Sequence, residues 1–301
     1  MSGPAKASPV TESKDARFNQ LDKMETSEIV SLMNQVDREV PIAIEAASEQ
    51  IANAVDAISK NYVRGGRLIY VGAGTSGRIA TLDASEVFPT FGVKDRVIAV
   101  MAGGLEALVN PSEGAEDDFE MGRKAISDLN LKEVDCLVGV ASSGTTPYVM
   151  GAVLEANSAN ATTVGIVCNT GSELSKTVDF PIEAVVGPEL IAGSTRLKAG
   201  TAQKMILNMI STITMIKAGK TYGNLMVDVV PSNKKLRHRA INIVSEITGA
   251  SSEQAEAELI GHEWNVKSAV VGIKLGLDAQ KAAALLEQSN GYLAIALGEI
   301  N

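Results

Sequence analysis

Apolar residues over positions 26–62 recur every three to four residues, which is the spacing of one face of an α-helix. Pro41 can open the second of two helices, because proline is tolerated in a first helical turn. The Gly65-Gly66 pair ends this section, so we expect residues 25–64 to form N-terminal helices. The positions that carry the pattern are Ile29, Leu32, Met33, Val36, Ile44, Ile51, Val55 and Ile58.

Short apolar runs alternate with helical stretches over residues 65–230. This alternation is typical of a parallel sheet with right-handed helical crossovers on both faces. We therefore predict an α/β fold with a five-stranded parallel sheet, for which we assume the flavodoxin-like order 2-1-3-4-5. The expected strands are residues 67–71, 97–101, 136–141, 163–168 and 180–186.

The flanking segments have different patterns. Residues 199–218 are apolar on much of a helical circumference, which predicts burial in the core or at a subunit interface. After Pro231 only short helical patterns follow, so residues 231–301 are expected to form a small helical, UBA-like domain. Residues 1–24 are polar and are expected to be a flexible arm, or else an arm onto a partner subunit.

Composition narrows the class of protein. The chain has 301 residues, of which 45% are hydrophobic, and a net charge of −9. The negative charge argues against nucleic-acid binding but permits a small anionic ligand at a local site. Since no apolar run reaches the ~18 residues of a membrane span and the N-terminus lacks a signal-like apolar stretch, we expect a cytoplasmic protein without membrane contact.

Cysteine and histidine give no sign of a metal centre. Cys136 and Cys168 each lie in an expected strand, which predicts buried reduced thiols. His238 and His262 lack the close spacing of a zinc pair. We therefore expect neither a metal site nor a cofactor.

The run Gly72-Ala73-Gly74-Thr75-Ser76-Gly77 lies between a strand and a helix. It matches the dinucleotide fingerprint G-x-G-x-x-G, but that function also needs an acidic residue at the end of the second strand. No acid follows that strand until Glu106. Gly74, Thr75 and Ser76 instead offer amides and hydroxyls at a helix N-terminus, which suits a phosphate or a sugar.

A second hydroxyl-rich loop, Ser142-Ser143-Gly144-Thr145-Thr146-Pro147, follows the third strand. An ordinary Ser/Thr helix cap is the simpler interpretation of such a loop. In the order 2-1-3-4-5, however, strands 1 and 3 are neighbours at the switch point, where open α/β sheets bind ligands. Both loops would then border one crevice, and Ser142, Ser143, Gly144, Thr145 and Thr146 become candidate phosphate ligands.

Other charged or polar candidates are ambiguous by themselves. Glu86, in Asp83-Ala84-Ser85-Glu86, and Glu116, in an acidic run, fit surface carboxylates near helix ends. Ser194 and Lys198 fit helix capping and surface charge as well as ligand contact. The basic run at residues 234–239 fits a solvated helix face.

The chain resembles the N-acetylmuramic acid 6-phosphate etherases over about residues 24–300, in runs that keep their order. The resemblance implies a sugar isomerase (SIS) fold, a homodimer and a relationship to the glucokinase regulatory protein. It also implies that Glu86 and Glu116 form the catalytic pair. The runs are GAGTSGRIATLDASEVFPTFG (72–92), AGG…EGAED (102–117), SSGTTPYV (142–149), GPELIAGSTRLKAGTAQKMILNMIST (187–212) and YGNLMVDV (222–229).

Two positions depart from the family pattern. Thr145 stands where the family usually has arginine, in S-G-R-T, so a cation is missing beside the expected phosphate loop. Residues 11–16, TESKDA, depart from the usual T-E-x-R-N pattern of the N-terminal arm. Both departures bear on substrate detail more than on fold.

The resemblance implies a carbon–oxygen lyase of cell-wall amino sugar recycling that releases D-lactate from N-acetylmuramic acid 6-phosphate. Glu116 is then the base at C2, and Glu86 the acid at the leaving oxygen, although the reverse assignment also fits. No metal is required, because the C1 aldehyde of the open sugar already acidifies the C2 proton. The alternatives are a sugar-phosphate isomerase and a non-catalytic sugar-phosphate sensor; the presence of both glutamates favours an enzyme.

The position of Glu86 poses a geometric problem. It lies ten residues beyond Ser76, so one continuous helix would carry it ~15 Å from the hydroxyl loop. Either the helix breaks early, or Glu86 serves a site shared with another subunit.

Overall fold

The computed structural model describes residues 9–110, 112 and 114–300. The chain divides into two compact units, one holding the chain up to Ala84 with Arg96–Ser211, and one holding Ser85–Asp95 with the chain from Thr212 onward. This division differs from the boundary expected at residue 231. Two long helices, α4 (Gly74–Phe91) and α8 (Lys198–Lys217), start in the first unit and end in the second.

The first unit contains a five-stranded parallel sheet in the order β2-β1-β3-β4-β5, which confirms the predicted order. Every strand starts within one residue of its predicted position. The last strand ends at Glu183, earlier than predicted; Ala184 and Val186 after it are buried outside the sheet, whereas Val185 is exposed. The strands are β1 (Leu68–Gly72), β2 (Val97–Met101), β3 (Cys136–Val140), β4 (Thr162–Val167) and β5 (Phe180–Glu183).

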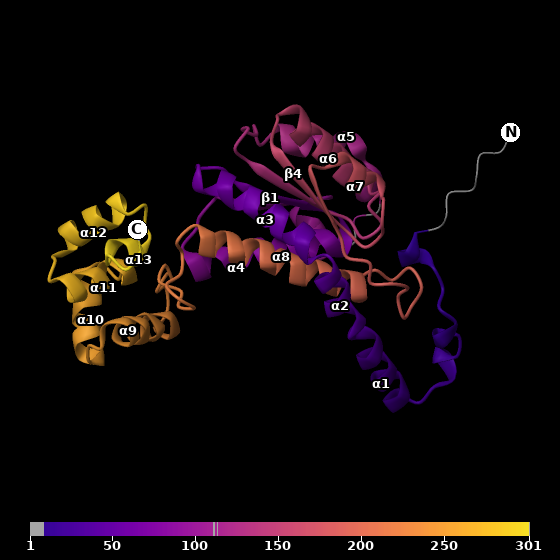
Figure 1. The fold of residues 1–301 in the computed structure, drawn as a ribbon. Helices are drawn as coiled ribbons and strands as arrows, with labels where there is room; N and C mark the ends of the chain where they lie inside the picture. Colours follow the sequence, from indigo (N-terminus) through magenta and orange to yellow (C-terminus); the bar gives the residue numbers. More distant parts are fainter. Residues whose placement is uncertain (1–8, 111, 113, 301) are drawn as a thin grey trace. The chain divides into compact units, whose positions relative to one another are not determined.

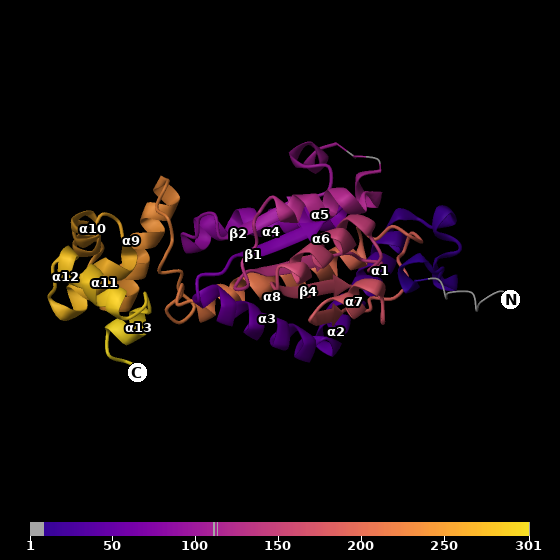
Figure 2. The same ribbon diagram turned by 90° about the horizontal axis from the view of Figure 1, so that it is seen from above.

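Helices cover both faces of this sheet (Figures 1 and 2). One face carries α5 (Phe119–Ser127), α6 (Pro147–Ser158) and α7 (Glu173–Thr177); the other carries α3 (Ser48–Val63) and the first parts of α4 and α8. Because both faces are covered, the central strands β1 and β3 are buried along their whole length.

The N-terminal section has three helices where the sequence pattern predicted two. They are α1 (Thr26–Asp37), α2 (Glu39–Ala46) and α3. The second helix starts at Glu39, two residues before Pro41. Proline is tolerated there because the first N–H groups of a helix have no partner within the helix.

The arm before α1 is packed rather than free over its described part. Residues 9–24 contain the short 3₁₀ turns Val10–Glu12, Ala16–Phe18 and Leu21–Lys23. Thr11 and Phe18 are buried within them. The expectation of a flexible arm is therefore wrong for this stretch, and residues 1–8 lie outside the described residues.

The second unit is helical apart from its loops, as predicted. The buried Lys267 ammonium joins three segments of this unit: it donates to the carbonyls of Gly219 (2.8 Å) and Gly291 (2.7 Å) and to Asp228 (2.5 Å). His262 is buried beside Ser268, as expected from its place among these helices. The helices are α9 (Lys234–Thr248), α10 (Ser252–Gly261), α11 (Val266–Leu275), α12 (Ala279–Gln288) and α13 (Leu293–Ala296).

Two further sequence expectations concern the cysteines and the basic run of residues 234–239. Cys136 and Cys168 are both buried and free, as predicted. The basic side chains of residues 234–239 lie on the exposed face of α9, in agreement with a solvated helix face. Over the described part of the chain, no helix is both long enough and apolar enough to cross a membrane.

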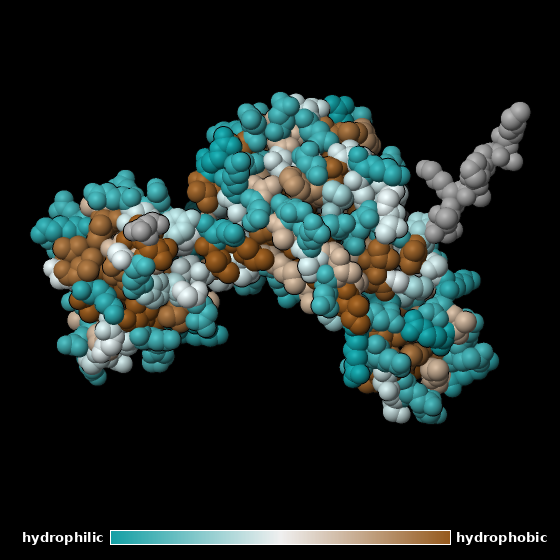
Figure 3. All heavy atoms as spheres, viewed as in Figure 1, coloured by the Kyte–Doolittle hydropathy of each residue, from teal (hydrophilic) through white to brown (hydrophobic). Residues whose placement is uncertain are grey.

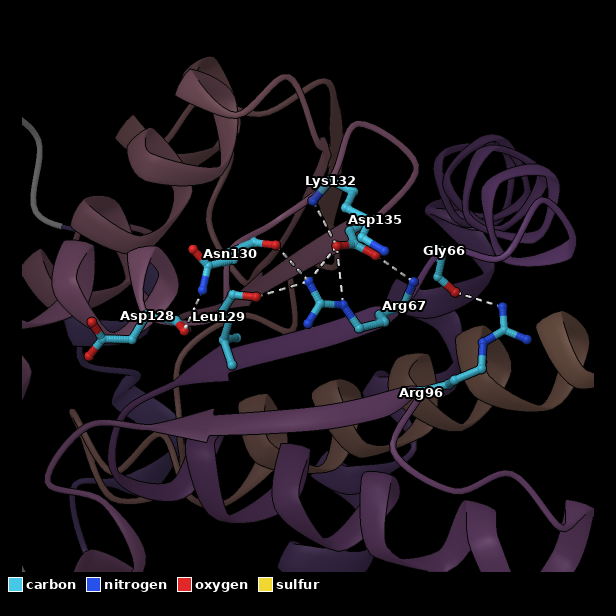
Figure 4. Close-up of polar contacts among 8 residues, drawn as sticks. All are labelled: Gly66, Arg67, Arg96, Asp128, Leu129, Asn130, Lys132 and Asp135. Carbon is cyan, nitrogen blue, oxygen red and sulfur yellow. Dashed lines mark hydrogen bonds and ion pairs between the residues drawn. The ribbon is translucent and has the colours of Figure 1, made fainter.

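An ion pair between the half-buried Arg67 and the buried Asp135 joins the amino ends of β1 and β3 (Figure 4). The Arg67 guanidinium donates to the Asp135 carboxylate at 2.6 Å and also to the carbonyls of Leu129 and Asn130. The same carboxylate accepts from the backbone N–H groups of Arg67 (2.7 Å) and Lys132 (2.9 Å). Burial would raise the pKa of Asp135, but these hydrogen bonds outweigh it and hold the pKa below its usual value.

We predict that Asp135→Ala lowers the free energy of unfolding by about 3–5 kcal/mol, because it leaves the Arg67 charge and two backbone N–H groups without their acceptor. Since the folded pKa is lowered, this stabilisation is present above the unfolded value of ~3.9 and is lost as the pH falls through the folded pKa. Urea unfolding at neutral and acidic pH measures both effects. Asp128→Ala breaks an exposed pair with Lys124 and should cost about 0.5 kcal/mol or less; equal losses in the two variants would contradict the prediction.

Candidate active site

The first hydroxyl loop is a direct passage from β1 into α4. A Cβ at Gly72 would lie 2.8 Å from the backbone nitrogen of Gly77, so both glycines permit the strand and the helix to approach each other closely. Gly74 adopts a left-handed φ of 52°. The backbone therefore explains the glycine pattern without a dinucleotide. Moreover, β2 is followed by Ala102 and two glycines rather than by an acid.

The second hydroxyl loop leads from β3 into α6. Thr146 occupies the N-cap position, but its side chain makes no capping hydrogen bond, so the simple helix-cap interpretation does not hold for it. The Ser143 hydroxyl accepts from the N–H (3.2 Å) and the hydroxyl (3.0 Å) of Thr145. Gly144 has a φ of 71°, and a Cβ there would lie 2.3 Å from the Ser172 hydroxyl. These contacts within the loop and with Ser172 fix its conformation. The N-terminus of α6 has no side-chain cap.

One buried amide holds the two loops together. Gln203, on α8, accepts from the Ser76 hydroxyl at 2.9 Å and donates to the Ser142 hydroxyl at 2.9 Å. Its side chain is completely buried. Ser142 keeps its own hydroxyl proton for a ligand, and Ser76 keeps a lone pair. Gln203 was not predicted from the sequence, where its only signal was a polar residue within an apolar helix.

The two loops border one crevice of about 330 Å³, as predicted from the strand order. Of the predicted ligands it collects Gly74, Thr75, Ser76, Ser142, Ser143, Thr145 and Thr146, together with the predicted catalytic residue Glu116. Gly144 lies within the loop but does not line the crevice. Five further residues line it as well: Glu12, Ala73, Asp117, Pro147 and Thr195.

The backbone around Glu116 is anchored on both sides. Ala115 packs against the apolar cluster beneath α6, and Asp118 caps α5 by accepting from the Met121 N–H at 2.9 Å. Earlier in the same connection, Arg78 of α4 donates to the carbonyls of Ala107 (2.8 Å) and Leu108 (3.1 Å). The exposed Glu116 side chain is therefore presented by a fixed turn at the edge of the crevice.

Glu86 does not reach this crevice within its own chain. The helix α4 runs without interruption to Phe91, so the expectation that it breaks early is wrong. Glu86 is exposed on α4, whereas Asp83 of the same motif is buried. The Asp83 carboxylate accepts from Asn208 at 2.6 Å and from the Tyr70 hydroxyl at 2.9 Å, which ties α4 to α8 and β1. An uninterrupted α4 is compatible with a surface carboxylate at Glu86 and with a site shared between subunits, which stays a prediction.

Lys198 and Ser194 do not line the crevice either. The Lys198 side chain is 1% exposed, and its ammonium donates to Glu39 at 2.8 Å. Its backbone N–H donates to the buried Glu189 carboxylate, which caps the start of α8. The lysine is therefore used in an internal ion pair, contrary to the expectation of ligand contact. Thr195, the neighbour of Ser194, is the residue that faces the crevice.

The charges around the crevice are negative. The described side chains that line it include the carboxylates of Glu12, Glu116 and Asp117, with no lysine or arginine. A bound phosphate would depend on hydroxyls, on backbone N–H groups and on the positive ends of α4 and α6. A neighbouring hollow of about 290 Å³ shares Gly74 and Glu116 with the crevice and contains Arg78 in its wall.

Comparisons with known proteins agree with this geometry. Residues 50–157 match the family model of the glucokinase regulatory protein N-terminal SIS domain, and residues 223–287 match that of the C-terminal lid domain of glucokinase regulatory protein. The UBA-like character expected of the C-terminal helices stays a prediction. A phosphoheptose isomerase structure from Francisella tularensis shares the fold, with a TM-score of 0.50 and 20% identity over 64% of this chain and 98% of that one. Fold and crevice together define a SIS-domain protein.

Sequence relatives define the family more narrowly. A protein from Streptomyces avermitilis named N-acetylmuramic acid 6-phosphate etherase is 50% identical over 95% of this chain and 93% of its own. One of the same name from Escherichia coli O1:K1 is 48% identical over 96% of this chain and 97% of its own. The chain belongs to the N-acetylmuramic acid 6-phosphate etherase family.

We predict that Gln203→Leu weakens the binding of a hexose 6-phosphate about tenfold, because two hydrogen bonds of ~0.5–1.5 kcal/mol each hold the loops in register. Leucine has a similar volume, so the fold should persist. Calorimetric titration measures the dissociation constant, and Gln280→Leu, on the exposed side of α12, is the control. Unchanged affinity in the Gln203 variant would mean that the loops keep their positions without the bridge.

Proposed function

We propose that this chain is a carbon–oxygen lyase that cleaves the lactyl ether of N-acetylmuramic acid 6-phosphate, giving N-acetylglucosamine 6-phosphate and D-lactate. The observation that carries the proposal is the meeting of Glu116 with two hydroxyl-rich loops in one crevice of a chain half identical to etherases. The proposed setting is cytoplasmic recycling of cell-wall amino sugars.

The reaction starts with removal of the C2 proton. Opening of the sugar ring gives an aldehyde at C1, which makes that proton acidic. Glu116 is the proposed base, because it is the carboxylate of the expected catalytic pair that lines the crevice. The electron pair then forms the C2–C3 double bond as the lactate oxygen leaves C3.

The second half of the reaction needs an acid and then a base. Protonation of the leaving oxygen gives D-lactate. Water then adds to the unsaturated aldehyde: its oxygen bonds to C3, and the proton held by Glu116 returns to C2. We assign the proton transfers at the leaving oxygen and at the water to Glu86, which would act as acid first and as base afterwards. Since Glu86 does not line the crevice of its own chain, this assignment requires Glu86 of a second copy.

The phosphate is placed at the loop that follows β3. Ser143 and Thr146 offer hydroxyls there, and the start of α6 offers free N–H groups. Thr145 takes the position of the arginine usual in the family, so the loop binds phosphate without a cation of its own. The carboxylates that line the crevice, Glu12, Glu116 and Asp117, would face the sugar part of the substrate, because they repel the phosphate.

A homodimer is part of the proposal. Met205, Met209 and Ile213 lie four residues apart on α8 and remain half-exposed, and Ile216 is 47% exposed. Apolar surface follows the line of α8 in Figure 3. A two-fold contact along such a stripe would bury it on both copies.

The other two functions considered are not favoured. An aldose–ketose isomerase has only a fold likeness in its support, at 20% identity. A sugar-phosphate sensor has the matches to the regulatory protein domains, but the full-length relatives at 48–50% identity carry the name of the etherase.

We predict that Glu116→Gln reduces D-lactate release from N-acetylmuramic acid 6-phosphate by ~10²–10⁴-fold, because the amide keeps the shape but cannot accept the proton. Enzymatic assay of D-lactate measures the rate. Glu120→Gln removes the same charge from an exposed position on α5 and should leave the rate unchanged. Near-normal release from Glu116→Gln would remove Glu116 from the mechanism.

Mixing two inactive variants tests the shared site. Glu86→Gln and Glu116→Gln should each be inactive, but a mixed dimer contains one site with both glutamates if they come from different chains. Random exchange at equal concentrations should then restore roughly a quarter of the wild-type activity. No recovery, with exchange verified by mass spectrometry, would place both glutamates in one chain. Full wild-type activity in a monomer would contradict the dimer itself.

A further inference from the structure

The N-terminal arm is joined to the phosphate loop by one buried amide. Asn169 donates to the Thr11 hydroxyl (3.1 Å) and to the carbonyl of Ser142 (2.9 Å), and it accepts from the Thr11 N–H (3.4 Å). Thr11 is completely buried, and Asn169 is 6% exposed. The arm is therefore held on the edge of the crevice by specific contacts rather than by general packing.

A chain of charges anchors the arm a second time. Arg17 donates to Asp15 at 2.8 Å and to Glu39 at 3.0 Å, and Glu39 also accepts from the buried Lys198 ammonium. Burial acts to raise the pKa of Glu39, but the hydrogen bonds from Lys198 and Arg17 outweigh it and lower the pKa. The carboxylate is thus ionised at neutral pH, and the arm is tied to α2 and to the start of α8.

Glu12 lies between these two anchors, and its carboxylate lines the crevice with Glu116. A Cβ at Gly193 would lie 3.0 Å from Glu12 Oε2, so the carboxylate sits closely over that glycine. Within the described part of the chain, Glu12 makes no side-chain hydrogen bond or ion pair. A carboxylate fixed at the edge of a crevice without a partner is available to accept from a ligand.

The charge of Glu12 indicates which part of a ligand it faces. A carboxylate repels a phosphate dianion, but it accepts strongly from hydroxyl and amide N–H donors. The amino sugar of the proposed substrate carries both kinds of donor, and the loop after β3 lines the same crevice.

We propose that Glu12 is a further residue of the active site, and that its carboxylate binds and positions the sugar by accepting hydrogen bonds from its hydroxyl or acetamido N–H groups. This inference rests on the proposed function. Thr11 and Asn169 are positioning residues, because they act by holding the arm. The short 3₁₀ turn Val10–Glu12 then forms one wall of the site, in addition to connecting the chain to α1.

Steady-state kinetics with N-acetylmuramic acid 6-phosphate test the proposal. Glu12→Ala should raise KM about tenfold or more, with a smaller change in kcat, because charge-assisted hydrogen bonds to the sugar are lost. Glu12→Gln, which keeps an acceptor oxygen, should lie between Glu12→Ala and wild type. The melting temperature should not change, since Glu12 is exposed. Asp22→Asn, an exposed acid in the same arm, is the control and should leave both constants unchanged.

Two results would overturn the proposal. One is a KM for Glu12→Ala within twofold of wild type. The other is a loss confined to kcat together with the disappearance of one limb of the pH–rate profile, which would assign Glu12 to proton transfer instead. Thr11→Val, which removes the hydroxyl but keeps the shape, should raise KM in the same direction and also lower the melting temperature.

Direct binding separates this proposal from the proposed function. If the wild-type protein releases no D-lactate, the etherase proposal fails. Calorimetric titration with N-acetylglucosamine 6-phosphate still tests Glu12: binding about tenfold weaker in Glu12→Ala than in wild type and Asp22→Asn supports the role in sugar binding. Equal binding in all three proteins, or none in the wild type, would overturn it.

Discussion

The whole site depends on the opposite directions that the chain takes after the neighbouring strands β1 and β3. The connection after β1 enters α4 on one face of the sheet, and the connection after β3 enters α6 on the other, so a crevice opens between two helix N-termini. Gln203 fixes its width by bridging Ser76 and Ser142. At the opposite ends of the same two strands, the ion pair of Arg67 and Asp135 fixes their register. Stability and ligand binding are thus built on the same strands but at different ends.

The two glutamates expected from the family differ in how the fold presents them. Glu116 stands on a short turn anchored by Ala115 and Asp118 at the crevice. Glu86 stands on a continuous helix whose motif partner Asp83 is committed to holding α4 against β1 and α8. A rigid helix cannot bend Glu86 towards its own crevice. In the proposed mechanism, a second copy of the chain supplies Glu86.

Much of the fold follows from local pattern, whereas the site only partly does. Alternating apolar runs were enough to predict the strands. The assumed strand order, which the structure has, then placed the two hydroxyl loops at one switch point, because a switch point is a property of topology. Two contacts could not be predicted, because they join residues far apart in the sequence. Ser76 and Gln203 are 127 positions apart, and Thr11 and Asn169 are 158 positions apart. Lys198 was misassigned because a lysine beside hydroxyl residues looks like an anion ligand until Glu39 is seen to neutralise it.

The double anchoring of the arm has a consequence for how the protein is made. Thr11 leaves the ribosome long before Asn169 and Lys198, the residues that retain the arm. During synthesis the N-terminal arm therefore lacks its contacts with Asn169 and with the Glu39–Lys198 pair until most of the sheet has been translated. One wall of the crevice is completed only then, so a nascent chain shorter than about two thirds of the protein cannot hold the ligand as the finished enzyme does.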